Sequence, residues 1–124
     1  MAELIPSPTV LHATGAPPKK ISEFVGRLAT GTTDVSVAVM DSPSGWSEPG
    51  QRPDFVEYTV VIEGEVLVEA ENGSVTVSAG QAAHAPAGQW VRYSTPAGGG
   101  ARYVSVCVPA FSPETVNRDR EAGG

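Results

Sequence analysis

A single glutamate stands in the middle of an apolar run. Glu57 lies within residues 55–62, among Phe, Val, Tyr, Thr and Ile. In an extended strand one face would carry Phe55, Glu57, Thr59 and Val61. A buried carboxylate is costly unless it is paired or hydrogen-bonded, and burial raises its pKa toward the range of a general acid or base. The alternative is an outward carboxylate paired with Arg92 or Arg102.

Two other side chains could take part in chemistry. His84 lies among small residues in the segment QAAHAPAG, which leaves space around a ring that can shuttle protons near neutral pH. The alternative is a packed histidine with its hydrogen bonds satisfied, and His12 is a weaker candidate still. Cys107 lies in the valine-rich segment VSVCV, where a thiol is more often inert packing than a nucleophile. We therefore predict Glu57 and His84 as the catalytic groups.

The aromatic residues could line the mouth of a pocket for an aromatic or polyketide-like ligand. They are Trp46, Trp90, Tyr58, Tyr93 and Tyr103. Because aromatic residues in strands are more often core, we expect most of them to lie in the core or an interface. Tyr93 shares a face with Val91 and has the best claim to point inward, which turns Arg92 toward the surface.

The elements that position these residues are short strands. Alternation or apolar runs predict strands at 9–13, 35–40, 55–62, 65–70, 74–78, 82–85, 89–94 and 101–108, with Asn72-Gly73 as a hairpin turn. Glu63-Gly64 is expected to be a turn. Residues 20–27 are expected to form a short helix or turn that plugs an open end. About eight strands with little helix are typical of a sandwich or barrel.

Two spaced motifs carry a resemblance to a known family. Gly64 follows Glu57 in an E-x6-G pattern, and Gly80, Pro86 and Gly88 form a G-x5-P-x-G pattern. In this order, with an Asn-Gly hairpin between them, they resemble the core of a small single-domain cupin of the RmlC-like type. The resemblance implies an all-β jelly-roll barrel (a double-stranded β-helix) over residues 34–108. Residues 1–33 would form an arm that packs on the barrel, and residues 109–124 a tail on its surface.

The motifs depart from the cupin pattern at the metal ligands. The resemblance implies three histidines and a glutamate. The histidine positions fall on Gln51 and Pro53 (or Gly50 and Arg52 with a longer spacer) and on Val91, and the final Asn falls on Thr95. Imidazole is a favoured ligand of Fe, Ni, Zn and Cu, so we expect no metal cofactor. The remaining metal alternative joins Glu57 to His84 or Gln51.

The resemblance also directs the face of Glu57 into the barrel. Gln51 would point inward and bond a substrate carbonyl or hydroxyl, or would instead cap loop backbone. We predict a metal-independent acid/base enzyme (isomerase, epimerase, lyase or cyclase) for a small organic or natural-product-like substrate. Its substrate contacts would be Gln51, Trp46, Tyr93, Val91 and Thr59. The alternatives are a non-catalytic ligand-binding or sensing module and a metal-dependent cupin with an unusual ligand set.

The composition limits the classes of partner that we expect for this chain. The chain of 124 residues has a net charge of −6, and phosphate contacts need clustered Lys and Arg, so we expect neither nucleic acid nor membrane as a partner. One cysteine allows no internal disulfide. No signal peptide is visible, and a cytoplasmic protein is expected. The family resemblance and symmetry favour a homodimer.

Overall fold

The computed structural model describes residues 1–13 and 17–119. Its elements are β1 (Thr9–Ala13), β2 (Lys19–Val25), β3 (Ser36–Ser42), β4 (Val56–Ala70), β5 (Gly73–Ser78), β6 (Ala82–Ala85), β7 (Val91–Ser94) and β8 (Ala101–Val108). The described ranges contain no helix, and so none that could cross a membrane. The predicted all-β architecture is confirmed.

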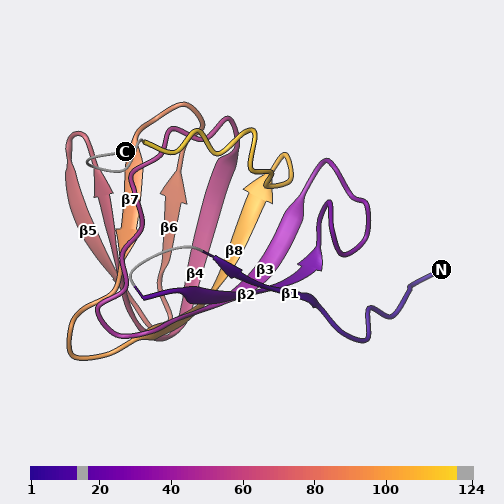
Figure 1. The fold of residues 1–124 in the computed structure, drawn as a ribbon, viewed down its shortest axis with the longest axis horizontal. Helices are drawn as coiled ribbons and strands as arrows, with labels where there is room; N and C mark the ends of the chain where they lie inside the picture. The colour runs from indigo at the N-terminus through magenta and orange to yellow at the C-terminus, as the bar shows by residue number, and fades with distance from the viewer. Residues whose placement is uncertain (14–16, 120–124) are drawn as a thin grey trace.

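Two antiparallel sheets share the long strand β4 (Figure 1). Its first half pairs with β8 on one side and β6 on the other, and its second half pairs with β5 and β7. Beyond β8 the first sheet continues through β3 and β2 to β1. The two sheets therefore fold around a common interior, as in a jelly roll.

The turn predicted at Glu63-Gly64 is wrong, because β4 continues through it. The pairing with β8 shifts register between Val61 and Glu63, and Gly64 has a φ of 78°. Glycine adopts positive φ without steric cost, so the strand bends here and passes from one sheet to the other. A Cβ on Gly64 would overlap the carbonyl oxygen of Gly100. A motif glycine thus marks a bend and a close backbone approach.

The helix or turn predicted at residues 20–27 is wrong for most of its length. Residues 19–25 form β2, which pairs with β1 and β3. The spacing of Ile21, Phe24 and Val25 fits a helix. The segment is nevertheless a strand, because hydrogen bonds to two neighbouring strands satisfy its backbone N–H and C=O groups. Alternation then turns Lys19, Ile21 and Glu23 to the interior. Polar residues at two of these three positions hide the strand pattern in the sequence.

The interior is divided between an apolar core and a second small cluster. Trp46, Val61, Val66, Val68 and their neighbours form the core, and Phe55, Cys107 and Val116 form the second cluster, with Phe111 against it. The C-terminal segment was expected to wrap the surface as a polar tail. It also enters the interior, because Ala110 is 0% and Val116 3% exposed.

Candidate active site

A cavity of about 320 Å³ lies between the inner face of the first sheet and the segments that cover it. Its walls come from β1, β2, β3, β4 and β8, from residues 27–28 and 48–51, and from residues 111–118. The arm strands β1 and β2 thus form part of the cavity wall. The cavity is at the small end of the range for ligand sites, roughly 300–1,000 Å³.

Glu57 reaches this cavity from β4. Phe55, Glu57 and Thr59 are all buried, whereas Tyr58 and Val60 are exposed, so the predicted inward face is the observed one. The Glu57 carboxylate accepts a hydrogen bond of 2.5 Å from the Ser105 hydroxyl. Burial is the main cause that raises the pKa of Glu57, and the Ser105 hydrogen bond and the Lys19 charge only partly oppose it. Glu57 is therefore a carboxyl suited to hold and release a proton.

The arginines that could have paired with an outward Glu57 have other partners. Arg92 binds Glu69 at 2.9 Å, and Arg102 lies 3.6 Å from Asp41. Both pairs are partly exposed. The Glu57 charge is therefore not neutralised by either arginine.

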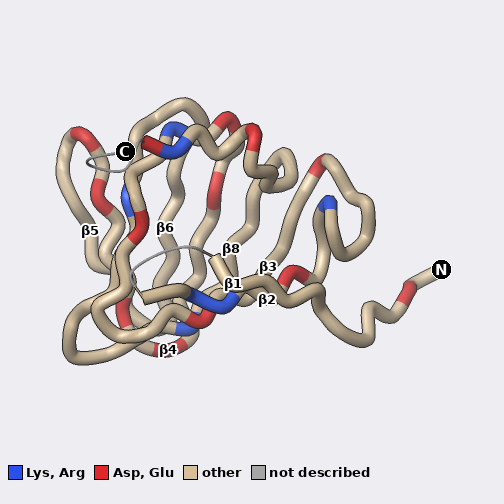
Figure 2. Tube along the Cα trace, in the orientation of Figure 1, with Lys and Arg blue, Asp and Glu red and all other residues tan. Residues whose placement is uncertain are grey.

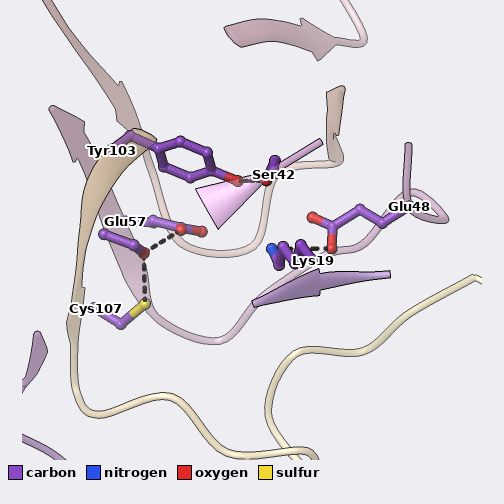
Figure 3. Close-up of polar contacts among 7 residues, drawn as sticks. Lys19, Ser42, Glu48, Glu57, Tyr103 and Cys107 are labelled. Carbon is purple, nitrogen blue, oxygen red and sulfur yellow. Dashed lines mark hydrogen bonds and ion pairs between the residues drawn. The ribbon is translucent and has the colours of Figure 1, made fainter. Parts of the chain in front are cut away.

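Lys19 and Ser105 are cavity residues that the sequence prediction missed. The Lys19 ammonium lies 3.5 Å from Glu48 Oε2 and 4.5 Å above the centre of the Trp46 ring. Burial acts to lower the pKa of Lys19, but nearby negative charges, led by Glu48, together outweigh it, so the pKa is raised. Lys19 is a cation near neutral pH. Its side chain and Glu57 point into the same space in Figure 3.

Gln51 faces the cavity as expected. Its backbone exchanges two hydrogen bonds of 2.9 Å with Val91, which fixes the position of the residue. Its side chain is buried, and its Oε1 atom has no hydrogen-bond partner among the described residues. A buried carbonyl oxygen without a donor is unfavourable, so this atom is a candidate contact for a ligand donor.

The other predicted substrate contacts belong to the core. Trp46, Val91 and Tyr93 pack together in the apolar cluster, and Thr59 is 1% exposed. None of the four lines the cavity. The Trp46 ring makes a cation–π contact with the Lys19 ammonium. Tyr93 is inward as predicted, and its pKa is raised first by burial and then by the charge of Glu57.

No family model matches the chain. Several solved structures resemble it at low identity. The polyketide cyclase RemF from Streptomyces resistomycificus is 17% identical with a TM-score of 0.69, over 98% of this chain and 81% of that one. An RmlC-like cupin from Shewanella frigidimarina is 15% identical with a TM-score of 0.70, over 87% and 89% of the two chains. The chain has the cupin fold. A predicted oxalate decarboxylase from Thermotoga maritima gives a TM-score of 0.71 at 15% identity, over 88% and 99%.

A curated relative shares more sequence with this chain. It bears the name endoribonuclease YbeY, from Myxococcus xanthus, and is 44% identical over 101 residues. The match covers 82% of this chain but 34% of the relative, so the chain spans about a third of that protein's length. The name describes the whole relative, whereas the match concerns one part of it.

His84 does not join Glu57 in the cavity, contrary to the prediction. It pairs across the sheet with Tyr58 on the outer face, and the two rings stack with centroids 5.1 Å apart. Ala85, one residue later, is the partner of Glu57. His84 lines a different hollow of about 710 Å³, beside β5, β6 and β7, in which it is the one titratable group. A one-residue difference in strand register therefore separates His84 from the acid/base groups.

The residues at the metal positions of the cupin motifs do not fit a transition metal. Val91 has no donor atom in its side chain, and Gln51 offers an amide oxygen in place of an imidazole. The buried Lys19 ammonium faces the same cavity as Glu57 and would oppose a bound cation. Within residues 1–13 and 17–119, no three His, Cys, Asp or Glu side chains gather around a common point. The described residues around Glu57 therefore do not form a transition-metal ligand set.

Proposed function

We propose that this cupin transfers protons to and from a small organic molecule held in the Glu57 cavity. The observation that carries the proposal is a buried carboxyl with a raised pKa, hydrogen-bonded to Ser105 and facing a cavity of about 320 Å³. A general acid or base works best when its pKa lies near the working pH. Isomerisation, epimerisation, elimination and cyclisation all use such a group.

The cavity also offers the surroundings that such a reaction needs. Apolar side chains make up much of the lining and reduce access of water. Lys19 supplies a buried positive charge, and Gln51 supplies an acceptor. Tyr93 lies near Glu57 and favours its carboxylate form, whereas Thr59 and His84 have no part in the proposed chemistry.

The test is exchange of carbon-bound protons for solvent deuterium. Proton NMR of small methyl and cyclic ketones in D2O would measure it with the wild type, Glu57→Gln and Glu65→Gln. Glu65 lies on the same strand but is exposed, so it is the matched control. We expect Glu57→Gln to lose about 100-fold or more of the rate, and Glu65→Gln to keep the wild-type rate. Wild-type exchange in Glu57→Gln, or no acceleration by the wild type, would overturn the proposal.

The name of the curated relative suggests a second candidate, an activity on RNA. Binding RNA requires a concentrated basic surface. Figure 2 shows the Lys and Arg residues of the described chain spread apart and interleaved with Asp and Glu. The net charge of −6 also opposes a polyanion. We therefore propose the small-molecule activity for this chain, and incubation with labelled single-stranded RNA should leave that RNA intact.

A further inference from the structure

The buried Gln51 side chain leaves an unused acceptor in the cavity wall. The residue is 4% exposed, and its backbone N–H and C=O groups are both hydrogen-bonded to Val91. Its Oε1 atom is buried without a donor in the described parts of the chain. A native fold rarely keeps such an atom unless a water or ligand donates to it. A hydroxyl group is the simplest ligand donor for this position.

Lys19 leaves unused donors in the same cavity. An ammonium carries three N–H donors, and Glu48, at 3.5 Å, is the hydrogen-bond partner of Lys19 among the described residues. The Trp46 ring lies beneath the ammonium at 4.5 Å, which stabilises the cation and fixes its place. A ligand oxygen that carries partial negative charge, such as a carbonyl oxygen, suits the remaining donors.

Glu23, Arg27, Glu114 and Arg118 also line the cavity, but the apolar part of the lining favours a compact apolar body between Lys19 and Gln51. Leu11, Ile21, Met40, Phe55 and Phe111 line the cavity. With a volume of about 320 Å³, the cavity suits a ligand of one or two rings rather than a polymer.

We propose that the ligand of this cavity is a small hydroxylated ketone, recognised at two points. Lys19 donates to its carbonyl oxygen, and Gln51 Oε1 accepts from its hydroxyl group. This inference rests on the proposed function, because it names the substrate class on which Glu57 acts.

The arrangement defines a balanced proton-transfer step. The Glu57 carboxylate takes a proton from the carbon next to the carbonyl group, and the C–H electron pair becomes the C=C bond of an enolate. The carbonyl oxygen gains the negative charge and is stabilised by the Lys19 ammonium. Return of the proton, or of a solvent deuteron, to carbon restores the ketone. No further reactant is needed for this exchange.

The experiment compares three probes that differ by one group each. They are 6-acetyl-2-naphthol, 2-acetylnaphthalene (which lacks the hydroxyl) and 2-naphthol (which lacks the carbonyl), with dissociation constants measured by fluorescence. For the wild type we expect 6-acetyl-2-naphthol to bind about tenfold more tightly than either truncated probe. Equal binding of all three probes, or no binding of 6-acetyl-2-naphthol up to its solubility limit, would overturn the inference.

Variants assign each preference to its residue. Gln51→Leu should lose the preference for the hydroxyl and keep that for the carbonyl. Lys19→Met/Glu48→Met, which removes both buried charges and so avoids an unpaired one, should do the reverse. Lys20→Met is the matched control, since Lys20 is exposed on the same strand. Survival of both preferences in both cavity variants would refute the assignment.

The exchange assay separates this inference from the proposed function. In 6-acetyl-2-naphthol the acetyl protons exchange, and Lys19→Met/Glu48→Met should slow that exchange at saturation by about 100-fold. Suppose that Glu57→Gln abolishes exchange while the cavity variants leave the probe preferences unchanged. The proposed proton transfer is then supported, and the proposed recognition of the ligand by Gln51 and Lys19 is refuted. Suppose instead that the cavity variants change the probe preferences as expected while Glu57→Gln keeps the wild-type exchange rate. The recognition of the ligand by Gln51 and Lys19 is then supported, and the proposed proton transfer by Glu57 is refuted.

Discussion

Lys19 and Glu48 form an ion pair across 3.5 Å with their side chains only 8% and 4% exposed. The other ion pairs of the described chain, such as Arg92–Glu69, lie at the surface. The buried pair joins the arm strand β2 to the loop before β4, so it fixes part of the cavity wall. Two charges are kept out of water at this position, which is costly unless each keeps its partner.

Breaking this pair should therefore destabilise the fold. We expect Glu48→Gln to lower the free energy of unfolding by about 3–5 kcal/mol, because Lys19 is left buried without its carboxylate. Glu69→Gln, which breaks the exposed pair with Arg92, should cost at most about 1 kcal/mol. Urea denaturation measures both. Equal losses in the two variants would show that the buried pair contributes no more to the free energy of unfolding than the exposed pair.

Glu57 should make stability depend on pH. Its pKa is raised above the ordinary 4.5 mainly by burial, with Lys19, Glu48, Ser105 and Tyr93 around it. Between 4.5 and the raised pKa the folded chain binds more protons than the unfolded chain. The free energy of unfolding must then fall as pH rises.

The test compares the wild type with Glu57→Gln, which cannot titrate at this position. We expect the wild type to lose stability relative to Glu57→Gln as the pH rises above 4.5, by urea denaturation. Glu65→Gln, at an exposed position, should track the wild type. A relative gain by the wild type over this range would mean that the fold stabilises the carboxylate instead.

Cys107 should be unreactive in the folded chain. It is 4% exposed, and burial, followed by the charge of Glu57, raises the pKa of its thiol to about 12. Because the thiolate is the reactive form, iodoacetamide at neutral pH should label Cys107 only when urea unfolds the chain. Mass spectrometry would follow the labelling. Labelling at the same rate with and without urea would contradict the buried position.

Two motif glycines should differ in their tolerance of alanine. Gly64 and Gly80 have φ values of 78° and 86°. A Cβ at Gly80 meets nothing within 4 Å, whereas one at Gly64 would overlap the backbone carbonyl of Gly100. We expect Gly80→Ala to cost about 1–2 kcal/mol, and Gly64→Ala at least about 3 kcal/mol, in thermal or urea unfolding. Similar costs would show that only φ matters at Gly64.

The fold could be predicted because its information is local. Period-two alternation around Glu57 and the segments 82–85 and 101–108 predicted strands that the structure contains. The hairpin was also predicted, but its two turn residues are Glu71 and Asn72, one position before the expected Asn72-Gly73, because Gly73 already pairs with Ala70. Errors arose where the inner face is polar, as at Lys19 and Glu23 in β2. There the apolar alternation that marks a strand is interrupted by the charged residues that line the cavity.

The site was predictable only in part, for a related reason. Alternation within β4 placed Glu57 inward, but the face of His84 depends on its register against Tyr58, which is a contact between strands. Lys19 faces the cavity because β2 pairs with β3 at the far side of the first sheet, and its partner Glu48 is far away in sequence. Such pairings are set by tertiary structure and leave no spacing pattern in the chain.

The most direct test of the central claim is the titration of the Glu57 carboxyl itself. Carbon-13 NMR of the glutamate side-chain carboxyls, assigned with Glu57→Gln, would follow its protonation from about pH 3 to about pH 9. We predict a midpoint above 4.5 for Glu57. A midpoint at or below 4.5 would mean that Glu57 is a permanently ionised structural group, and would contradict its role as the proton-transfer group of the cavity.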